Sequence, residues 1–269
     1  MLEIASALTA GLSPFWIGVI ASLIAGAATG LGALPVFFIR TLSQRLQDSL
    51  LGFGAGVMLA ATCFALLVPG IESGEALFGS ELTAVLVVAL GVLIGAGIFF
   101  VLNHLVPHEH FIKGPEGLHT RKLRRIWLFI AAIALHNLPE GLAVGVGFGD
   151  GDLARGLTLM FGIALQNLPE GLVVAVALLS VGYSRSTAFW VALATGLVQP
   201  IGGVIGSGAV ALVDTLLPFA LAFAAGAMLF VISDEIIPET HRKGFEREAT
   251  ASLLIGFVLM MVLDVALEG

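Results

Sequence analysis

Charged residues are scarce in this sequence of 269 residues, and cysteine is almost absent. Charged side chains make up 12% of the chain, with 12 Lys and Arg against 19 Asp and Glu, whereas hydrophobic residues make up 58%. The mean hydropathy is +1.05. No soluble domain of this size needs so much apolar surface, so the composition predicts an all-α polytopic membrane protein, a single transmembrane domain over residues 1–269. The single Cys63 excludes a disulfide within the chain and a thiolate metal cage.

Eight apolar runs are long enough to cross a bilayer as helices, and their cores contain no Lys or Arg. Of the 12 Lys and Arg residues, all except Arg155 follow an odd-numbered run. The positive-inside rule makes that side cytoplasmic, so both termini are predicted to be extracytoplasmic. The runs cover about 14–39, 50–71, 83–105, 126–148, 154–180, 187–213, 216–238 and 249–267.

Two short sequence matches predict an internal symmetry. Ala55–Leu59 in the second run (AGVML) resembles Ala225–Leu229 in the seventh (AGAML), and Thr29–Leu31 in the first resembles Thr195–Leu197 in the sixth. The members of each pair lie on helices that run in opposite directions. We therefore expect a 3+2+3 inverted-repeat arrangement, which in secondary transporters places the substrate site near the midplane.

The predicted cytoplasmic loop at about 106–125 is rich in histidine. It carries His108, His110 and His119, and His104 precedes it. Histidine-rich tracts can hold metal weakly, but a solvated basic loop explains the same residues equally well.

A duplicated motif lies at membrane depth in the fourth and fifth runs. The two copies, 30 residues apart, read IALHNLPEGL and IALQNLPEGL. Residues four apart share a helix face, so His136 aligns with Glu140 in one copy and Gln166 with Glu170 in the other. A carboxylate at this depth is costly and is read as a functional site with a partner to be found.

Three kinds of partner are conceivable for the two glutamates. Lys or Arg would form an ion pair, but none lies in a run core. Protonation would neutralise each glutamate singly, and a bound cation would neutralise both. Imidazole nitrogen together with carboxylate and amide oxygens suits first-row divalent ions such as Zn²⁺, Fe²⁺ or Mn²⁺. The duplication of such a ligand set at one depth favours the metal.

The motif pair HNLPEG and QNLPEG also resembles the signature of the ZIP (Zrt/Irt-like protein) family of divalent metal transporters, in its bacterial form. The resemblance extends over essentially the whole chain, including the eight runs and the histidine-bearing loop between the third and fourth. It implies uptake of zinc, or of iron, manganese or cadmium, into the cytoplasm by a multi-pass protein of the bacterial inner membrane. The metal is then the transported substrate, with no catalytic cofactor and no enzymatic activity.

Carried over position by position, the resemblance implies two adjoining metal sites. In members with a two-metal centre, acidic residues can stand at the positions of Asn167 and Gln199, so the amides here predict one ion at a time. The primary ligands are His136, Glu140, Gln166 and Glu170, and the second site uses Asn137, Asn167 and Gln199.

Acidic residues also end the seventh run, at its predicted cytoplasmic mouth. They suggest an exit pathway that passes the ion towards the cytoplasm, although an ordinary solvated helix end has the same composition. The residues of this predicted pathway are Asp234, Glu235, Glu239 and His241.

Alternating access about the midplane site is the predicted mechanism. A proton-coupled carrier of another solute and a metal-selective channel with the same site remain as alternatives. An intramembrane metalloenzyme would need a hydrolytic arrangement such as His-Glu-x-x-His, which is absent. The expected partners are divalent metal ions and the lipid bilayer, with no nucleic acid, and a homodimer is left open.

Overall fold

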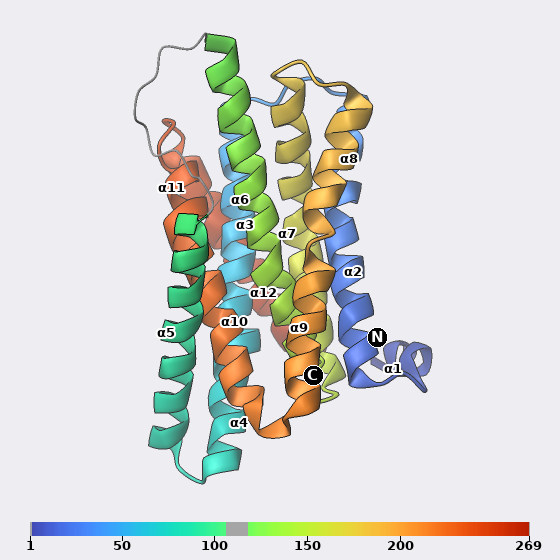
Figure 1. The fold of residues 1–269 in the computed structure, drawn as a ribbon, viewed down its shortest axis with the longest axis vertical. Helices are drawn as coiled ribbons and strands as arrows, with labels where there is room; N and C mark the ends of the chain where they lie inside the picture. The colour runs from blue at the N-terminus through green and yellow to red at the C-terminus, as the bar shows by residue number, and fades with distance from the viewer. Residues whose placement is uncertain (1, 106–117, 269) are drawn as a thin grey trace.

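The computed structural model describes residues 2–105 and 118–268, and within these ranges the chain is helical with no strand (Figure 1). The α-helices are α1 (Leu2–Thr9), α2 (Pro14–Ala33), α3 (Gln44–Ala61), α4 (Val68–Phe78), α5 (Glu81–Leu105), α6 (Leu118–Gly147), α7 (Leu153–Leu179), α8 (Arg185–Gly196), α9 (Gln199–Leu212), α10 (Leu217–Val231), α11 (Ile237–Thr240) and α12 (Glu246–Glu268). Two 3₁₀ segments, η1 (Leu34–Phe37) and η3 (Asp214–Leu216), and two π-helical segments, η2 (Thr62–Leu67) and η4 (Ile232–Ile236), complete the described elements.

Eight helical segments of the described residues are long and apolar enough to cross a membrane, which confirms the prediction of an all-α multi-pass protein. We number them S1 to S8. S2 combines α3, η2 and α4, S6 combines α8 and α9, and S7 combines α10, η4 and α11. Their bounds are Pro14–Phe37, Gln44–Phe78, Glu81–Asn103, Ile126–Gly147, Leu153–Leu179, Arg185–Leu212, Leu217–Thr240 and Glu246–Leu267.

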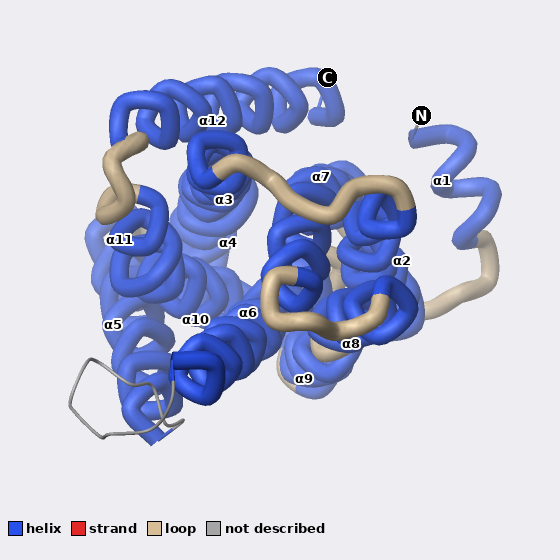
Figure 2. The backbone as a smooth tube through the Cα atoms, turned by 90° about the horizontal axis from the view of Figure 1, so that it is seen from above, coloured by secondary structure: helices blue, strands red, loops and turns tan. Residues whose placement is uncertain are grey.

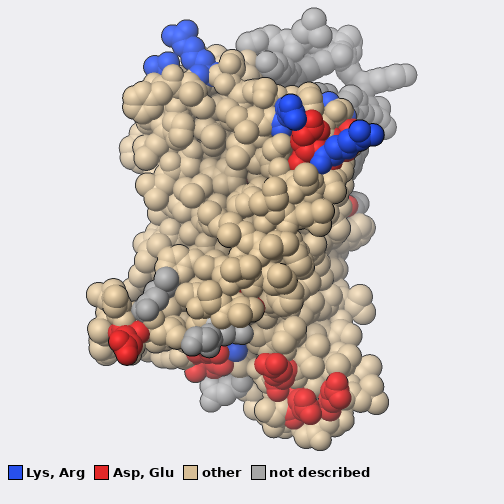
Figure 3. Space-filling model, turned by 180° about the vertical axis from the view of Figure 1, so that it is seen from behind, with Lys and Arg blue, Asp and Glu red and all other residues tan. Residues whose placement is uncertain are grey.

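The charge pattern of the surface fits a membrane-embedded molecule. On the face shown in Figure 3, Lys and Arg gather mainly at one end, Asp and Glu gather mainly at the other, and the wide middle is largely free of both. The histidine-rich loop at about 106–125 lies mostly outside the described residues, as do the side chains of His104, His108, His110 and His119.

Helix starts follow local sequence signals. Three helices begin after a polar residue whose side chain accepts a hydrogen bond from a free backbone N–H of the first turn. These N-caps are Ser43 before α3, Asp152 before α7 and Ser184 before α8.

Close backbone contacts at glycine join S1, S4, S5 and S6 into one group, which we call the motif bundle. A Cβ atom placed on Gly26 of S1 would lie 2.2 Å from the carbonyl oxygen of Gly196 in S6. A Cβ on Gly171 of S5 would lie 1.9 Å from the carbonyl oxygen of Thr29 in S1. Small residues allow membrane helices to approach this closely.

The remaining spans, S2, S3, S7 and S8, pack against one another, and we call them the flanking bundle. Close backbone contacts at glycine join them in two pairs, S2 with S8 and S3 with S7. A Cβ on Gly56 of S2 would lie 1.9 Å from the carbonyl oxygen of Leu253 in S8, and a Cβ on Gly95 of S3 would lie 2.1 Å from that of Phe223 in S7. Figure 2 shows the two groups next to each other, with α3 beside α7 and α10 beside α6. No described glycine brings the backbones of the two groups this close.

Candidate metal centre

The duplicated motif lies inside the motif bundle. His136, Asn137 and Glu140 project from α6, and their counterparts Gln166, Asn167 and Glu170 project from α7. Gln199, the first residue of α9, comes from the point where S6 breaks before Pro200. All seven of the predicted ligands are buried, with exposed fractions of 6% or less.

Gly141 explains how Gln199 reaches the motif. A Cβ at Gly141 would lie 1.9 Å from the carbonyl oxygen of Gln199, so only glycine lets the start of α9 lie against α6 at this point. The amide of Gln199 is thereby placed next to Glu140, one residue before this glycine.

Glu140 has no exposed surface and accepts a hydrogen bond on each carboxylate oxygen. Gln166 Nε2 donates to Oε1 at 2.7 Å, and Gln199 Nε2 donates to Oε2 at 2.6 Å. Both donors are neutral amides from other spans. Hydrogen bonds to a charged group are the stronger class, so these two contacts stabilise the buried carboxylate without a basic residue.

Asn137 connects the two glutamates. Its Nδ2 donates to Glu170 Oε1 at 3.1 Å and to the carbonyl oxygen of Ile133 at 2.9 Å, and its Oδ1 accepts a hydrogen bond from Gln199 Nε2 at 2.7 Å. The two copies of the motif therefore belong to one hydrogen-bond network.

Asn167 attaches this network to S1. Its Oδ1 accepts a hydrogen bond from Gln166 Nε2 at 2.7 Å, and its Nδ2 donates to the carbonyl oxygen of Ala25 at 2.7 Å. Six of the seven predicted ligands are thus linked directly or through one another.

His136 is placed differently, because it faces S7 of the flanking bundle. Its Nε2 lies 3.3 Å from Glu235 Oε2, which is an ion-pair distance without the alignment of a hydrogen bond. Within the described residues, no three His, Cys, Asp or Glu side chains form a ready metal site. A cation held here would therefore need amide oxygens in addition to Glu140 and Glu170.

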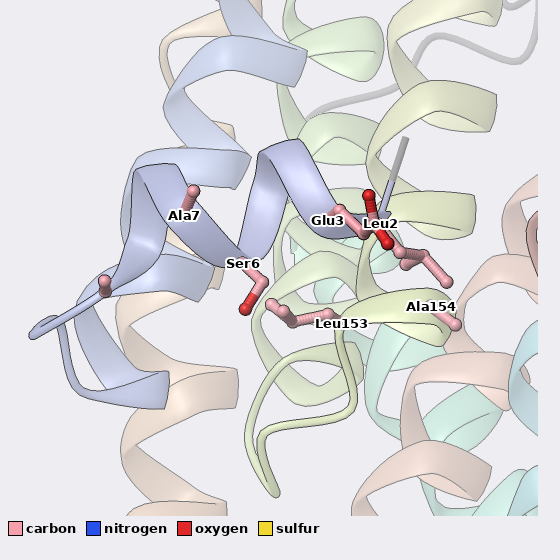
Figure 4. A pocket seen from close by; sticks show the side chains of 7 residues that line it. Leu2, Glu3, Ser6, Ala7, Leu153 and Ala154 are labelled. Carbon is pink, nitrogen blue, oxygen red and sulfur yellow. The ribbon is translucent and has the colours of Figure 1, made fainter.

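The buried Arg155 does not supply the missing positive charge. It lies at the start of α7, where it forms an ion pair with Asp150 and lies 3.7 Å from Asp152. The surface pocket beside it, between α1 and α7, is a separate feature lined by residues such as Leu2, Ser6 and Leu153 (Figure 4).

Residues 116–264 match the family model described as ZIP zinc transporter. The chain belongs to the ZIP family. It is 49% identical over 250 residues to the zinc transporter GufA of Myxococcus xanthus, with 93% of this chain and 98% of the relative covered. It is 43% identical over 241 residues to the zinc transporter ZIPB of Bordetella bronchiseptica, with 90% and 78% covered. The zinc transporter ZupT of Chlorobaculum parvum is 32% identical over 253 residues, with 90% and 94% covered.

Membership of the ZIP family confirms the resemblance that the motif pair indicated, and it places the chain among transporters rather than enzymes. The match to the ZIP model includes every residue predicted for the metal site and for the exit pathway, from His136 to His241.

The predicted exit residues of this ZIP protein do not form one cluster. Of the four, Glu235 is the one that contacts a predicted metal ligand, His136, in the part of the chain that the structure describes. Asp234 Oδ2 accepts a hydrogen bond from Asn103 Nδ2 of α5 at 3.1 Å. Glu239 pairs with Arg242 and Lys243, which follow it by three and four residues.

His241 connects two neighbouring elements in the described structure. Its Nδ1 lies 2.9 Å from the carbonyl oxygen of Ile237, and its Nε2 lies 2.9 Å from Thr250 Oγ1 of α12. Both ring nitrogens are thus engaged between the end of S7 and the start of S8.

Asn103 is a residue that sequence reasoning missed. Asn103 is 8% exposed, and from S3 its side chain contacts Asp234 of S7. One signal was available, because Asn103 and the adjacent His104 are the strongly polar residues of the run 83–105.

Proposed function

We propose that this ZIP family member carries divalent transition-metal cations, zinc foremost, into the cytoplasm through the centre between α6 and α7. One observation carries the proposal: Glu140 and Glu170 are buried together inside a membrane bundle, and the donors that reach them there are neutral amides. Relatives 49% and 43% identical are named zinc transporters, which supports zinc as the cargo.

Charge balance supports a single ion. Glu140 and Glu170 together supply two negative charges, which one divalent cation neutralises, whereas a second cation would leave excess charge in a medium of low dielectric. His136, Glu140, Gln166 and Glu170 form the primary ligand set of this proposal. Asn137, Asn167 and Gln199 adjoin it and carry no charge.

Two features support the inverted repeat. The pairing of spans is preserved when S1 is exchanged with S6, S2 with S7, S3 with S8 and S4 with S5, because S2 packs on S8 as S7 packs on S3, and S1 packs on S5 as S6 packs on S4. The π-helical segments also start at matching places, at Thr62 in S2 and Ile232 in S7. In this proposal Lys and Arg mark the cytoplasmic side of the inner membrane, so both termini lie on the extracytoplasmic side.

The division into two bundles supports alternating access. Backbones touch at glycines within the motif bundle and within the S2–S8 and S3–S7 pairs of the flanking bundle, while S2 meets S5 and S4 meets S7 without such contacts. Interfaces of this looser kind permit the motif bundle to move against the flanking bundle with its ligands intact. Since His136 lies on one bundle and Glu235 on the other, their contact is one that such movement would break.

Tracer uptake into proteoliposomes tests the proposed function. We expect saturable accumulation of ⁶⁵Zn, compared with ⁵⁵Fe and ⁵⁴Mn, that rises when the vesicle interior is made negative. A potential of 100 mV contributes about 2.3 kcal/mol per charge, and so about twice that for a dication. If none of the three metals accumulated, the protein would be a carrier of another solute. If metal uptake did not saturate with concentration, the protein would be a channel.

The exit pathway gives a sharper prediction within the same assay. Glu235→Gln is expected to slow zinc uptake by about tenfold, because it removes the carboxylate charge that lies 3.3 Å from the buried His136 Nε2. A tenfold change corresponds to about 1.4 kcal/mol. Glu239→Gln is the matched control, because the Glu239 side chain is as exposed as that of Glu235, 20% against 19%, but pairs with Arg242 and Lys243 instead of a predicted metal ligand. Its uptake should stay within about twofold of wild type, since ion pairs with solvent-exposed partners contribute little. Equal losses in the two variants would contradict a special role for Glu235.

A further inference from the structure

The amides around the two glutamates share one orientation. Gln166 Nε2 uses its hydrogens on Glu140 Oε1 and Asn167 Oδ1, and Gln199 Nε2 uses its hydrogens on Glu140 Oε2 and Asn137 Oδ1. In both glutamines the NH₂ end therefore faces a carboxylate oxygen and an asparagine oxygen. This arrangement stabilises the Glu140 carboxylate without a bound cation.

The same amides are unsuited to a metal ion in this orientation. An N–H group repels a cation, whereas the carbonyl oxygen at the other end of the amide is a ligand. A half turn about the terminal bond of glutamine exchanges the two ends in place, and this terminal torsion is broad and two-fold rather than locked. After such a turn, the oxygen of Gln199 would stand next to Glu140 Oε2 and Asn137 Oδ1 and complete a set of oxygen ligands.

A second observation points to the same event. Gln199 Oε1 is buried and has no hydrogen-bond partner within the described residues, and the buried His136 Nε2 likewise makes no hydrogen bond there, although it lies 3.3 Å from Glu235 Oε2. A buried acceptor without a donor is destabilising. These two atoms are ligand types for Zn²⁺, and they belong to residues of α6 and α9.

We propose that Gln166 and Gln199 are positioning residues that substitute for the cargo during the metal-free half of the transport cycle. Their N–H groups stabilise Glu140 while the site returns unloaded, as Asn137 does for Glu170, and their oxygens turn towards the ion when it enters. This inference rests on the proposed function, because it concerns the return step of a carrier. It explains how the empty site, with its two buried acids, can return to the outward-facing state although no basic residue pairs with those acids.

Comparison of two flux modes tests the inference. Net ⁶⁵Zn uptake into zinc-free vesicles requires the unloaded return, whereas exchange of external ⁶⁵Zn against internal zinc does not. Gln199→Glu keeps the size of the side chain but replaces the N–H donors with a third carboxylate. We expect the ratio of net uptake to exchange to fall about tenfold, since one hydrogen bond to a charged group is lost and a repulsion is added.

Gln47→Glu is the matched control. Gln47 lies on α3, where its Nε2 donates to the carbonyl oxygen of Leu42, so the substitution adds the same charge outside the centre. Its flux ratio should equal that of wild type. If Gln199→Glu loses both fluxes, the ratio is measured with Gln199→Met, which removes the donors without adding charge and should also lower it.

The outcomes separate the inference from the proposed function. A wild-type flux ratio in the Gln199 variants overturns the inference while leaving metal transport intact. Wild-type protein that gives neither net uptake nor exchange overturns the proposed function itself.

Discussion

Glu140→Gln is expected to reduce the initial rate of zinc uptake by at least about 100-fold. The substitution removes half of the negative charge that the proposed site offers to a dication, and loss of one partner from a buried charged pair costs about 3–5 kcal/mol. It also brings a new NH₂ group towards Gln166 and Gln199, which already present N–H donors at this position. The measurement is ⁶⁵Zn uptake into proteoliposomes with the amount of folded protein matched between variants.

Asp48→Asn is the control for this experiment. Asp48 is also an acid with no exposed surface inside a span, where Gln44 donates to it at 2.7 Å, but it lies on α3 in the flanking bundle. Its uptake should stay within a few fold of wild type. If Glu140→Gln retained a third of the wild-type rate, or if the two variants lost uptake equally, the motif glutamate would not be a ligand of the transported ion.

Gly171→Ala is expected to destabilise the motif bundle and abolish uptake. A Cβ at this position would lie 1.9 Å from the carbonyl oxygen of Thr29, so α2 and α7 must separate to admit the methyl group. Overpacking of this kind costs about 1–3 kcal/mol. Separation would also displace Glu170, the residue next to it, from the hydrogen bond with Asn137. The thermal midpoint of the purified protein and zinc uptake are the two readouts.

Gly97→Ala provides the matched substitution. Gly97 lies on the exposed face of α5, and a Cβ there meets no atom within 4 Å. Since alanine also favours helix over glycine by about 1 kcal/mol, this variant should be as stable as wild type or slightly more stable. Equal thermal midpoints for the two alanine variants would show that the approach of α7 to α2 is not constrained by Gly171.

The spans and the motif residues were predictable because their signals are local. Length and hydropathy identify a membrane helix, and the spacing of four residues puts His136 and Glu140 on one face whatever the rest of the chain does. The contact between Glu140 and Gln199 was predictable only from the resemblance to the ZIP family. It depends on the break before Pro200 and on the absence of a side chain at Gly141, which place two distant spans in contact.

The predicted exit pathway was inferred from the depth of its residues in the membrane, and depth alone does not determine which of them contact the metal site. Residues at the end of S7 share a depth, but the rotation of S7 about its axis decides which of them reaches His136, and hydropathy does not encode that rotation. Glu239 could have been set apart from sequence, because Arg242 and Lys243 follow it at the spacing of helical ion pairs. Asn103 carried no motif, and its contact with Asp234 depends on the packing of two spans.

The π-helical segment Ile232–Ile236 sets the angular register of the C-terminal end of S7. Each residue of an α-helix turns the chain by about 100°, and a π-helical stretch accommodates an additional residue without breaking the helix. Asp234 and Glu235 lie within that stretch, so the directions in which they point are offset from those that the upstream turns of α10 would dictate. A one-residue deletion between Ile232 and Ile236 would therefore rotate Glu239 and His241 relative to α10, whereas the same deletion in the loop at 241–245 would leave every span in phase.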